Sequence, residues 1–140
     1  MPDTFIVQLE EGAKLPTRTF SGDAGFDLYV FGDHTIPPGG HANIPTGVRV
    51  QFAEGWWGRI TGRSSTYHKR GLLVIEGVID QGYTGPLYVC VRNPNLTPVE
   101  IANDDRLGQL IPHRTADIVL EAGKIGLTER GSRGFGSSGA

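Results

Sequence analysis

A chain of 140 residues, 38% of them hydrophobic, has the length of a single domain with one modest core. Its 13 basic and 15 acidic residues nearly cancel, which excludes the overall positive field that draws proteins onto nucleic acid or anionic membranes. The single cysteine, Cys90, excludes a disulfide or a cysteine metal site within the chain and fits a reducing, cytoplasmic setting. No stretch resembles a membrane span or a secretory leader, so we expect a soluble protein.

Short apolar runs separated by turn residues dominate the sequence. Glycine and proline together account for 30 of the 140 residues (21 and 9), which favours tight turns over long helices. Val48, Val50 and Phe52 alternate with polar residues, so they would share the core face of one strand. Further strands are expected at Phe5–Leu9, Trp56–Ile60, Leu72–Ile79, Leu87–Val91, Val99–Ala102, Leu107–Ile111 and Ile118–Leu120. Many short strands without an internal repeat predict an all-β barrel, sandwich or jelly roll.

Two segments in the first half of the chain carry polar groups at turns. Ala24–Leu28 is typical of a turn that enters a strand, where Asp27 could hold a water molecule of a bound Mg²⁺. Gly62–Ser65 combines a permissive backbone, an arginine and two hydroxyls, a suitable cradle for phosphate oxygens. An ordinary capped turn explains the second segment as well, and one or two helical turns capped by a serine are expected after it.

A glycine-rich hairpin is predicted at Gly77–Pro86, with Asp80 at the end of an apolar strand. Asp80 could act there as a general base that polarises a water molecule. The alternative makes Asp80 a turn former and Tyr83 a packing aromatic.

Polar residues also precede the strand at Leu107–Ile111. Asp105 and Arg106 are explained by a surface ion pair, and Gln109 alternates away from the apolar Leu110.

The composition changes after Leu127, where the chain has too little apolar surface to fold alone. Residues 1–127 would form the β domain and residues 128–140 a glycine-rich tail. Taken alone, this composition favours a disordered terminus without a role, although Phe135, with Arg130 and Arg133 close by, is unusual in such a segment.

Together the five segments resemble, in order and spacing, the five signature motifs of the trimeric dUTPase family. The matching segments are Ala24–Leu28, Gly58–Ser65, Gly77–Gly85, Asp105–Ile111 and Arg130–Gly139, so the resemblance runs over most of the chain. It implies a β jelly roll that forms a homotrimer, with each active site assembled from all three subunits. It also implies Mg²⁺-dependent hydrolysis of dUTP to dUMP and pyrophosphate.

The resemblance assigns roles residue by residue. Asp80 would be the catalytic base for the water that attacks the α-phosphorus, and Asp27 would reach the Mg²⁺ through water. Tyr83 would pack beneath the deoxyribose, Phe135 would stack over the uracil, and Arg130 would close on the terminal phosphate. Substrate-binding residues are expected to be Arg63, Ser64, Ser65, Gly77, Val78, Ile79, Tyr83, Tyr88, Gln109, Arg130, Phe135, Gly136 and Ser137.

Four positions depart from the family pattern. Arg133 and Asp104 stand where the family usually has glycine, Gly108 where it commonly has alanine, and Gly82 where it often has an acid. None of these changes removes a proposed catalytic group, but Arg133 could alter how the tail closes or add a phosphate contact.

Three other functions compete with this assignment. A dCTP deaminase would share the fold, but its chemistry relies on a glutamate after the hairpin, and Leu87–Asn93 offers no carboxylate. A nucleotide-gated module would bind a regulatory protein, for which the sequence gives no support. A ligand-free structural domain leaves the five segments unexplained.

Overall fold

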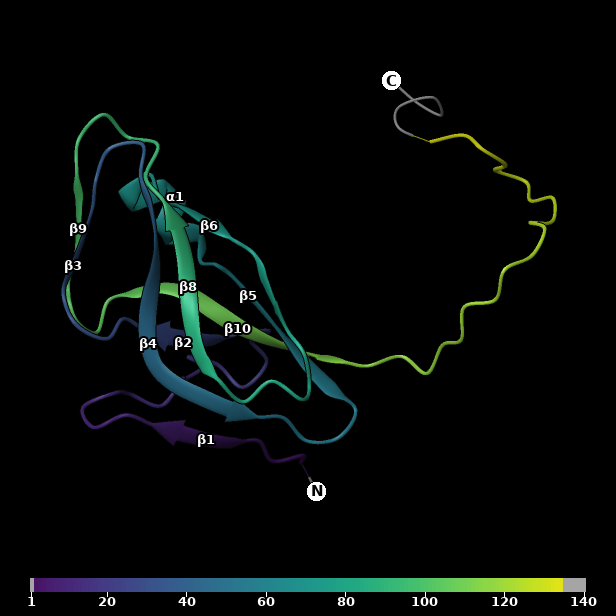
Figure 1. Cartoon of the computed structure of the whole chain (residues 1–140), viewed down its shortest axis with the longest axis horizontal. Coiled ribbons are helices and arrows are strands. Elements are labelled where there is room, and N and C mark those ends of the chain that lie inside the picture. Colours follow the sequence, from purple (N-terminus) through teal and green to yellow (C-terminus); the bar gives the residue numbers. More distant parts are fainter. Residues whose placement is uncertain (1, 135–140) are drawn as a thin grey trace.

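The computed structural model describes residues 2–134. One sheet has the strand order β1-β4-β8-β6, formed by Ile6–Leu9, His41–Gln51, Pro86–Arg92 and Leu73–Ile75. A second sheet has the order β2-β10-β5-β7, formed by Phe26–Tyr29, Arg106–Arg114, Trp56–Gly62 and Gly77–Ile79. The short strands β3 (His34–Ile36) and β9 (Val99–Ile101) make a separate pair. This is the predicted all-β, jelly-roll-like fold (Figure 1).

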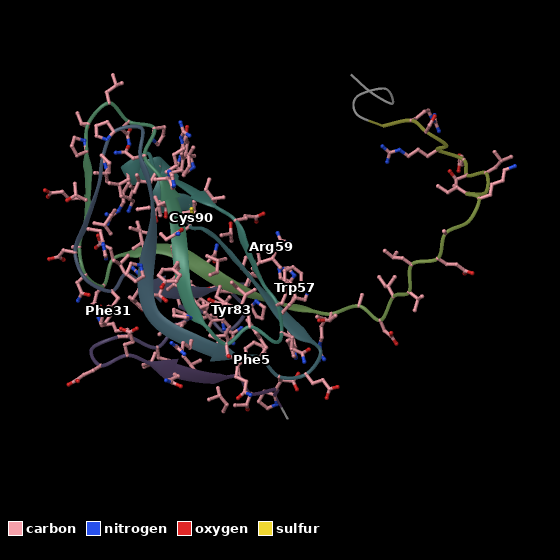
Figure 2. The ribbon with its side chains drawn as sticks, in the orientation of Figure 1. Phe5, Phe31, Trp57, Arg59, Tyr83 and Cys90 are labelled. Atoms are coloured by element: carbon pink, nitrogen blue, oxygen red, sulfur yellow. The ribbon has the colours of Figure 1, made fainter. Side chains whose placement is uncertain are left out.

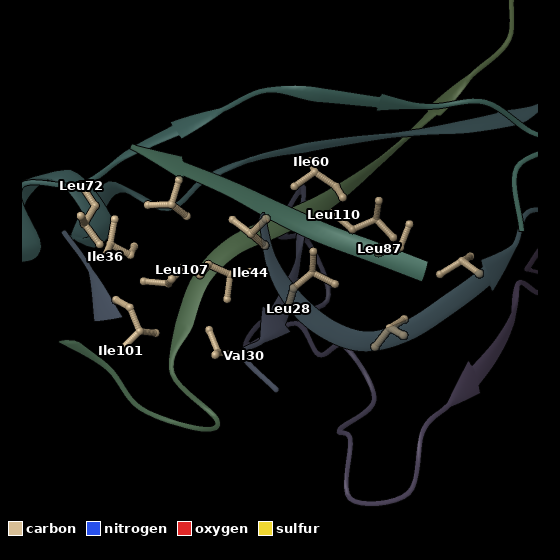
Figure 3. Packing of buried hydrophobic residues seen from close by; sticks show 14 of the residues in the cluster. Leu28, Val30, Ile36, Ile44, Ile60, Leu72, Leu87, Ile101, Leu107 and Leu110 are labelled. Carbon is tan, nitrogen blue, oxygen red and sulfur yellow. The ribbon is translucent and has the colours of Figure 1, made fainter. Parts of the chain in front are cut away.

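Both four-stranded sheets contribute to one apolar core (Figure 3). Val48, Val50 and Phe52 are buried on the same side of the chain, as their alternation predicts. They pack with residues of the second sheet such as Leu28 and Ile60. Because side chains of a β-strand alternate between its two faces, Arg49 and Gln51, which alternate with these three residues, point outward.

The only helix in residues 2–134 is α1 (Ser64–Arg70), which has seven residues and is too short to cross a membrane. The predicted serine cap is wrong. Arg63 occupies the N-cap position in an extended conformation, no side chain caps the helix, and Ser64 is already the first helical residue. The buried Thr66 hydroxyl donates instead to the carbonyl of Leu107 at 2.6 Å, which ties α1 to β10.

Two strand predictions differ from the structure. The apolar run at Leu72–Ile79 divides at Glu76, because β6 pairs with β8 whereas β7 pairs with β5. The predicted strand at Ile118–Leu120 is absent, and the three side chains are 70%, 88% and 93% exposed. The last strand ends at Arg114, and from there to residue 134 the chain runs away from the β domain (Figure 1).

Candidate functional site

Asp27 on β2 stands between two arginines. Its Oδ1 accepts from Arg63 Nε at 2.9 Å, and its Oδ2 lies 3.4 Å from Arg106 Nη1. The Asp27 side chain is only 14% exposed, so these ion pairs are partly shielded from solvent. The result is a positively charged group of side chains with a carboxylate at its centre.

Arg63 is held in one orientation by the chain around it. Its Nη1 donates to the carbonyl of Arg106 at 3.1 Å and to Ser65 Oγ at 3.2 Å. Its backbone N–H donates to the carbonyl of Leu107 at 3.4 Å. A guanidinium fixed in this way is suited to bind an anion without further ordering.

Gln109 completes this group from β10, where it lies opposite both Asp27 and Thr61. Its Nε2 donates to the carbonyl of Gly62 at 3.2 Å, and its Oε1 occupies the space that a Cβ at residue 25 would need. Gly25 therefore allows Gln109 to lie across the end of the sheet. We call Asp27, Arg63, Ser65, Arg106 and Gln109 the arginine cluster.

Arg106 is the member that sequence reasoning missed, because its pairing was attributed to the neighbouring aspartates. The β2–β10 register shifts between Arg106 and Gly108, and such a bulge re-aims a side chain. Asp105 instead pairs with Arg70 at 2.9 Å. Asp104 adopts a φ of 71°, in the left-handed region, which explains why glycine is usual there, and its carboxylate pairs with Lys14 at 3.1 Å.

A second group of predicted residues lies on β7, on the turn after it and on β8. The hairpin predicted at Gly77–Pro86 is wrong, because β7 belongs to one four-stranded sheet and β8 to the other. Among the described strands β7 pairs with β5 alone, so its other edge does not pair with β8. A Cβ at Gly77 would meet no heavy atom within 4 Å, and Val78 and Tyr88 are exposed. The chain thus leaves backbone groups of Gly77–Ile79 beside open space.

The turn between β7 and β8 holds Tyr83 close to Asp80. The backbone N–H of Tyr83 donates to the carbonyl of Asp80 at 3.0 Å, and its hydroxyl donates to the carbonyl of Pro86 at 2.9 Å. A Cβ at Gly85 would collide with the Tyr83 ring, so glycine lets the ring lie against the turn. Figure 2 shows Tyr83 near the start of β8, away from Cys90. No hydrogen bond or ion pair in residues 2–134 engages the Asp80 carboxylate, which is exposed.

The arginine cluster and Asp80 lie at opposite ends of β5. Ile79, next to Asp80, is opposite Gly58, whereas Arg63 follows the last residue of β5. Gly58 and Arg63 are five residues apart, which is about 17 Å along an extended strand. One chain therefore does not bring its own Asp80 to its own arginine cluster.

The predicted tail residues lie apart from both groups. Arg130 is exposed and donates from Nε to the carbonyl of Arg133 at 2.6 Å. The segment after β10 that carries it runs away from the β domain (Figure 1). Phe135, Gly136 and Ser137 lie outside the described residues. Ser64 is exposed at the first position of α1, beside the arginine cluster.

In the part of the chain that the structure describes, no group of three or more His, Cys, Asp or Glu side chains is placed to hold a metal ion. Asp27 can still accept a metal-bound water, because a carboxylate has about four lone-pair sites and the two arginines face two of them. Magnesium commonly binds through one or two carboxylates together with substrate phosphates. The residues thus fit Mg²⁺ that arrives with a phosphate ligand.

Known proteins resemble the chain in sequence and in fold. The sequence model of the dUTPase family matches residues 11–139. The deoxyuridine 5'-triphosphate nucleotidohydrolase of Mycolicibacterium gilvum is 39% identical, over 96% of this chain and 93% of that protein. The dUTPase of Staphylococcus bacteriophage 80alpha with dUPNHPP superposes with a TM-score of 0.92 at 28% identity, over 99% of this chain and 100% of that one. A D95N variant of the phage phi11 dUTPase, described with a structural Mg(II) ion, superposes with a TM-score of 0.80 at 27% identity, over 88% of this chain and 98% of that one.

Proposed function

The chain belongs to the dUTPase family and hydrolyses dUTP to dUMP and pyrophosphate, and we propose that three copies of it build each active site together. The separation of Asp80 from the arginine cluster is the observation that carries this proposal. One copy would supply the arginine cluster, a second the turn that carries Asp80 and a third the tail. A closed ring of identical subunits repeats such a shared site three times.

The C-terminal segment supports an assembly of this kind. Ile118, Val119 and Leu120 expose three consecutive apolar side chains in a segment that pairs with none of the described strands. A neighbouring copy would remove this surface from water. Fifteen residues lie between Arg114 and Arg130, and an extended chain of that length spans about 50 Å. The tail is therefore long enough to reach a site on another copy.

Hydrolysis would use Asp80 as a general base. Its carboxylate accepts a proton from a water molecule while the water oxygen bonds to the α-phosphorus. The bond from that phosphorus to the bridging oxygen breaks, and pyrophosphate leaves. Because no described side chain pairs with Asp80, its oxygens are available for this proton.

The arginine cluster would position the phosphate chain. Arg63 presents a fixed cation, Ser64 and Ser65 present hydroxyls, and Gln109 presents a side-chain amide. Arg130, Gly136 and Ser137 of the tail would close over the phosphates from another copy. Such contacts act through orientation and charge, which are the main protein contributions to phosphoryl transfer.

Asp27 would hold Mg²⁺ through a water molecule, and the ion would neutralise charge on the three phosphates and limit their conformations. The two arginines beside Asp27 keep this carboxylate in place for that contact. Magnesium would therefore be recruited with the nucleotide.

Uracil would enter the open edge of β7. Backbone groups of Gly77, Val78 and Ile79 would pair with its polar edge, with Tyr88 opposite and Phe135 stacked above. Cytosine would present a donor where uracil presents an acceptor, and the unpaired buried groups would disfavour it strongly. Tyr83, ordered by its bond to Pro86, would crowd the 2′-hydroxyl of a ribonucleotide.

Asp80→Asn tests the catalytic assignment. The variant should bind a non-hydrolysable dUTP analogue normally, because the amide keeps the shape of the side chain. Its turnover should fall by about 10²–10⁴-fold, the contribution typical of a general base. Analogue affinity and pyrophosphate release are measured on the same preparation, and turnover within tenfold of the parent would remove Asp80 from this role.

A further inference from the structure

The described part of the tail contains one organised turn. Between residues 116 and 127 the structure describes no hydrogen bond, whereas residues 128–134 make several. Gly131 has a φ of 60°, in the left-handed region that glycine accepts, and its N–H donates to Thr128 Oγ1 at 3.0 Å. The order in this segment is therefore local and lies immediately before Phe135.

Two arginine side chains close this turn from opposite directions. Arg130 donates from Nε to the carbonyl of Arg133 at 2.6 Å, and Arg133 donates from Nε to the carbonyl of Arg130 at 2.9 Å. Arg133 also donates from Nη2 to the carbonyl of Glu129 at 3.0 Å. We call residues 128–134, held by these contacts, the arginine turn.

The two arginines use their guanidinium groups differently. The contact of Arg130 described in the turn involves Nε, and the terminal nitrogens of a guanidinium suit bidentate binding of a phosphate. Arg133 commits both Nε and Nη2 to main-chain carbonyls. Its side chain therefore holds the backbone of residues 129 and 130 in the turn.

We propose that Arg133 is a positioning residue, which holds the arginine turn in the form that delivers Arg130 to the substrate phosphates. The proposal rests on the proposed role of the tail. In water the turn is weak, because a few exposed hydrogen bonds do not offset the entropy of ordering seven residues. Its contribution arises when the tail covers the nucleotide, since a preformed turn lowers the ordering cost of closure. Glycine, usual at this position in the family, would not provide these contacts.

A double-mutant cycle tests the proposal on the full-length protein. Arg133→Ala should lower kcat/KM for dUTP about fivefold, the effect of losing roughly one net hydrogen bond. In an Arg130→Ala background the same substitution should change kcat/KM less than twofold, because Arg133 acts through Arg130. Affinity for dUMP, which lacks the phosphates that Arg130 would contact, should not change.

Two further variants separate geometry from charge. Arg133→Lys keeps the positive charge but lacks the fixed pair of donors, so it should resemble Arg133→Ala. Lys124→Ala removes a cation from the segment between β10 and the arginine turn and should leave kcat/KM unchanged. The proposal would be overturned in favour of a direct phosphate contact if Arg133→Lys had the kcat/KM of the parent. Equal losses of kcat/KM on Arg133→Ala with and without Arg130 would also overturn it. An effect below twofold in the parent would also overturn it.

The double-mutant cycle separates the positioning role of Arg133 from the proposed role of Arg130 in the tail. If Arg130→Ala alone lowers kcat/KM strongly and Arg133→Ala does not, the tail keeps its role and only the positioning role of Arg133 is lost. If Arg130→Ala has no effect, the assignment of the tail fails first, and that of Arg133 fails with it.

Discussion

The arginine cluster and the tail both carry arginines for which we propose phosphate contacts, but the two sets of arginines are held in contrasting ways. Arg63 is fixed by Asp27, by the carbonyls of β10 and by the end of β5, all within a packed domain. Within residues 2–134, the hydrogen bonds of the Arg130 and Arg133 side chains stay inside the turn to which they belong. A cation in a packed site needs no ordering when substrate arrives, whereas a cation on a tail can close over the substrate and open for product release.

Deleting residues 130–140 removes the arginines of the tail and leaves the arginine cluster of the packed domain intact, and we expect this change to have the largest effect. We expect turnover of dUTP to fall by about 100-fold or more, because the tail would exclude water and complete the phosphate contacts. The free energy of unfolding should not change, since residues 115–134 add nothing to the apolar core. Thermal unfolding and pyrophosphate release are measured in parallel. Undiminished turnover would contradict the role of the tail.

Gly25→Ala disturbs the packed arginine cluster without removing any polar group. The new Cβ would take the position of Gln109 Oε1 and turn that side chain away from the phosphate chain. We expect kcat/KM to fall about tenfold, the effect of losing one hydrogen bond to a charged group. Because the displaced atoms are the far end of a flexible side chain, the domain should remain folded.

Two controls make this prediction specific. Gly22→Ala lies in the same loop with nothing within 4 Å of its Cβ, and it should retain full activity. In a Gln109→Ala background, Gly25→Ala should have no further effect. A tenfold loss in that background as well would show that Gly25 acts by another route.

The strands and the residues of the proposed phosphate site differ in how far the sequence predicts their positions. Alternation predicted the core strand through Val48 and Phe52, because one buried face imposes a period of two. The strand β3 was missed because His34–Ile36 contains one apolar residue, Ile36, after two polar ones, and one apolar residue shows no alternation. Ile118–Leu120 is apolar enough for a strand, yet a strand also needs a partner, and residues 2–134 provide none.

The site was predicted in part through resemblance and in part through the chemistry of its residues. Asp27, Arg63 and Gln109 come together because β2, β5 and β10 are neighbours, which their order along the chain does not reveal. Arg106 could not be assigned, because its pairing with Asp27 follows from a register shift in β10. The spacing of motifs likewise did not reveal how far Asp80 lies from Arg63 in one chain.

Mixing two inactive variants tests the shared site most directly. Asp80→Asn and Arg63→Ala should each be nearly inactive alone, since each damages every site of its own assembly. If Asp80 and Arg63 act from different copies, random trimers formed from equal amounts should recover about one quarter of the parent turnover. Mixed trimers that remain as inactive as either variant would show that both residues act within one chain, and would contradict the proposal of a site built by three copies.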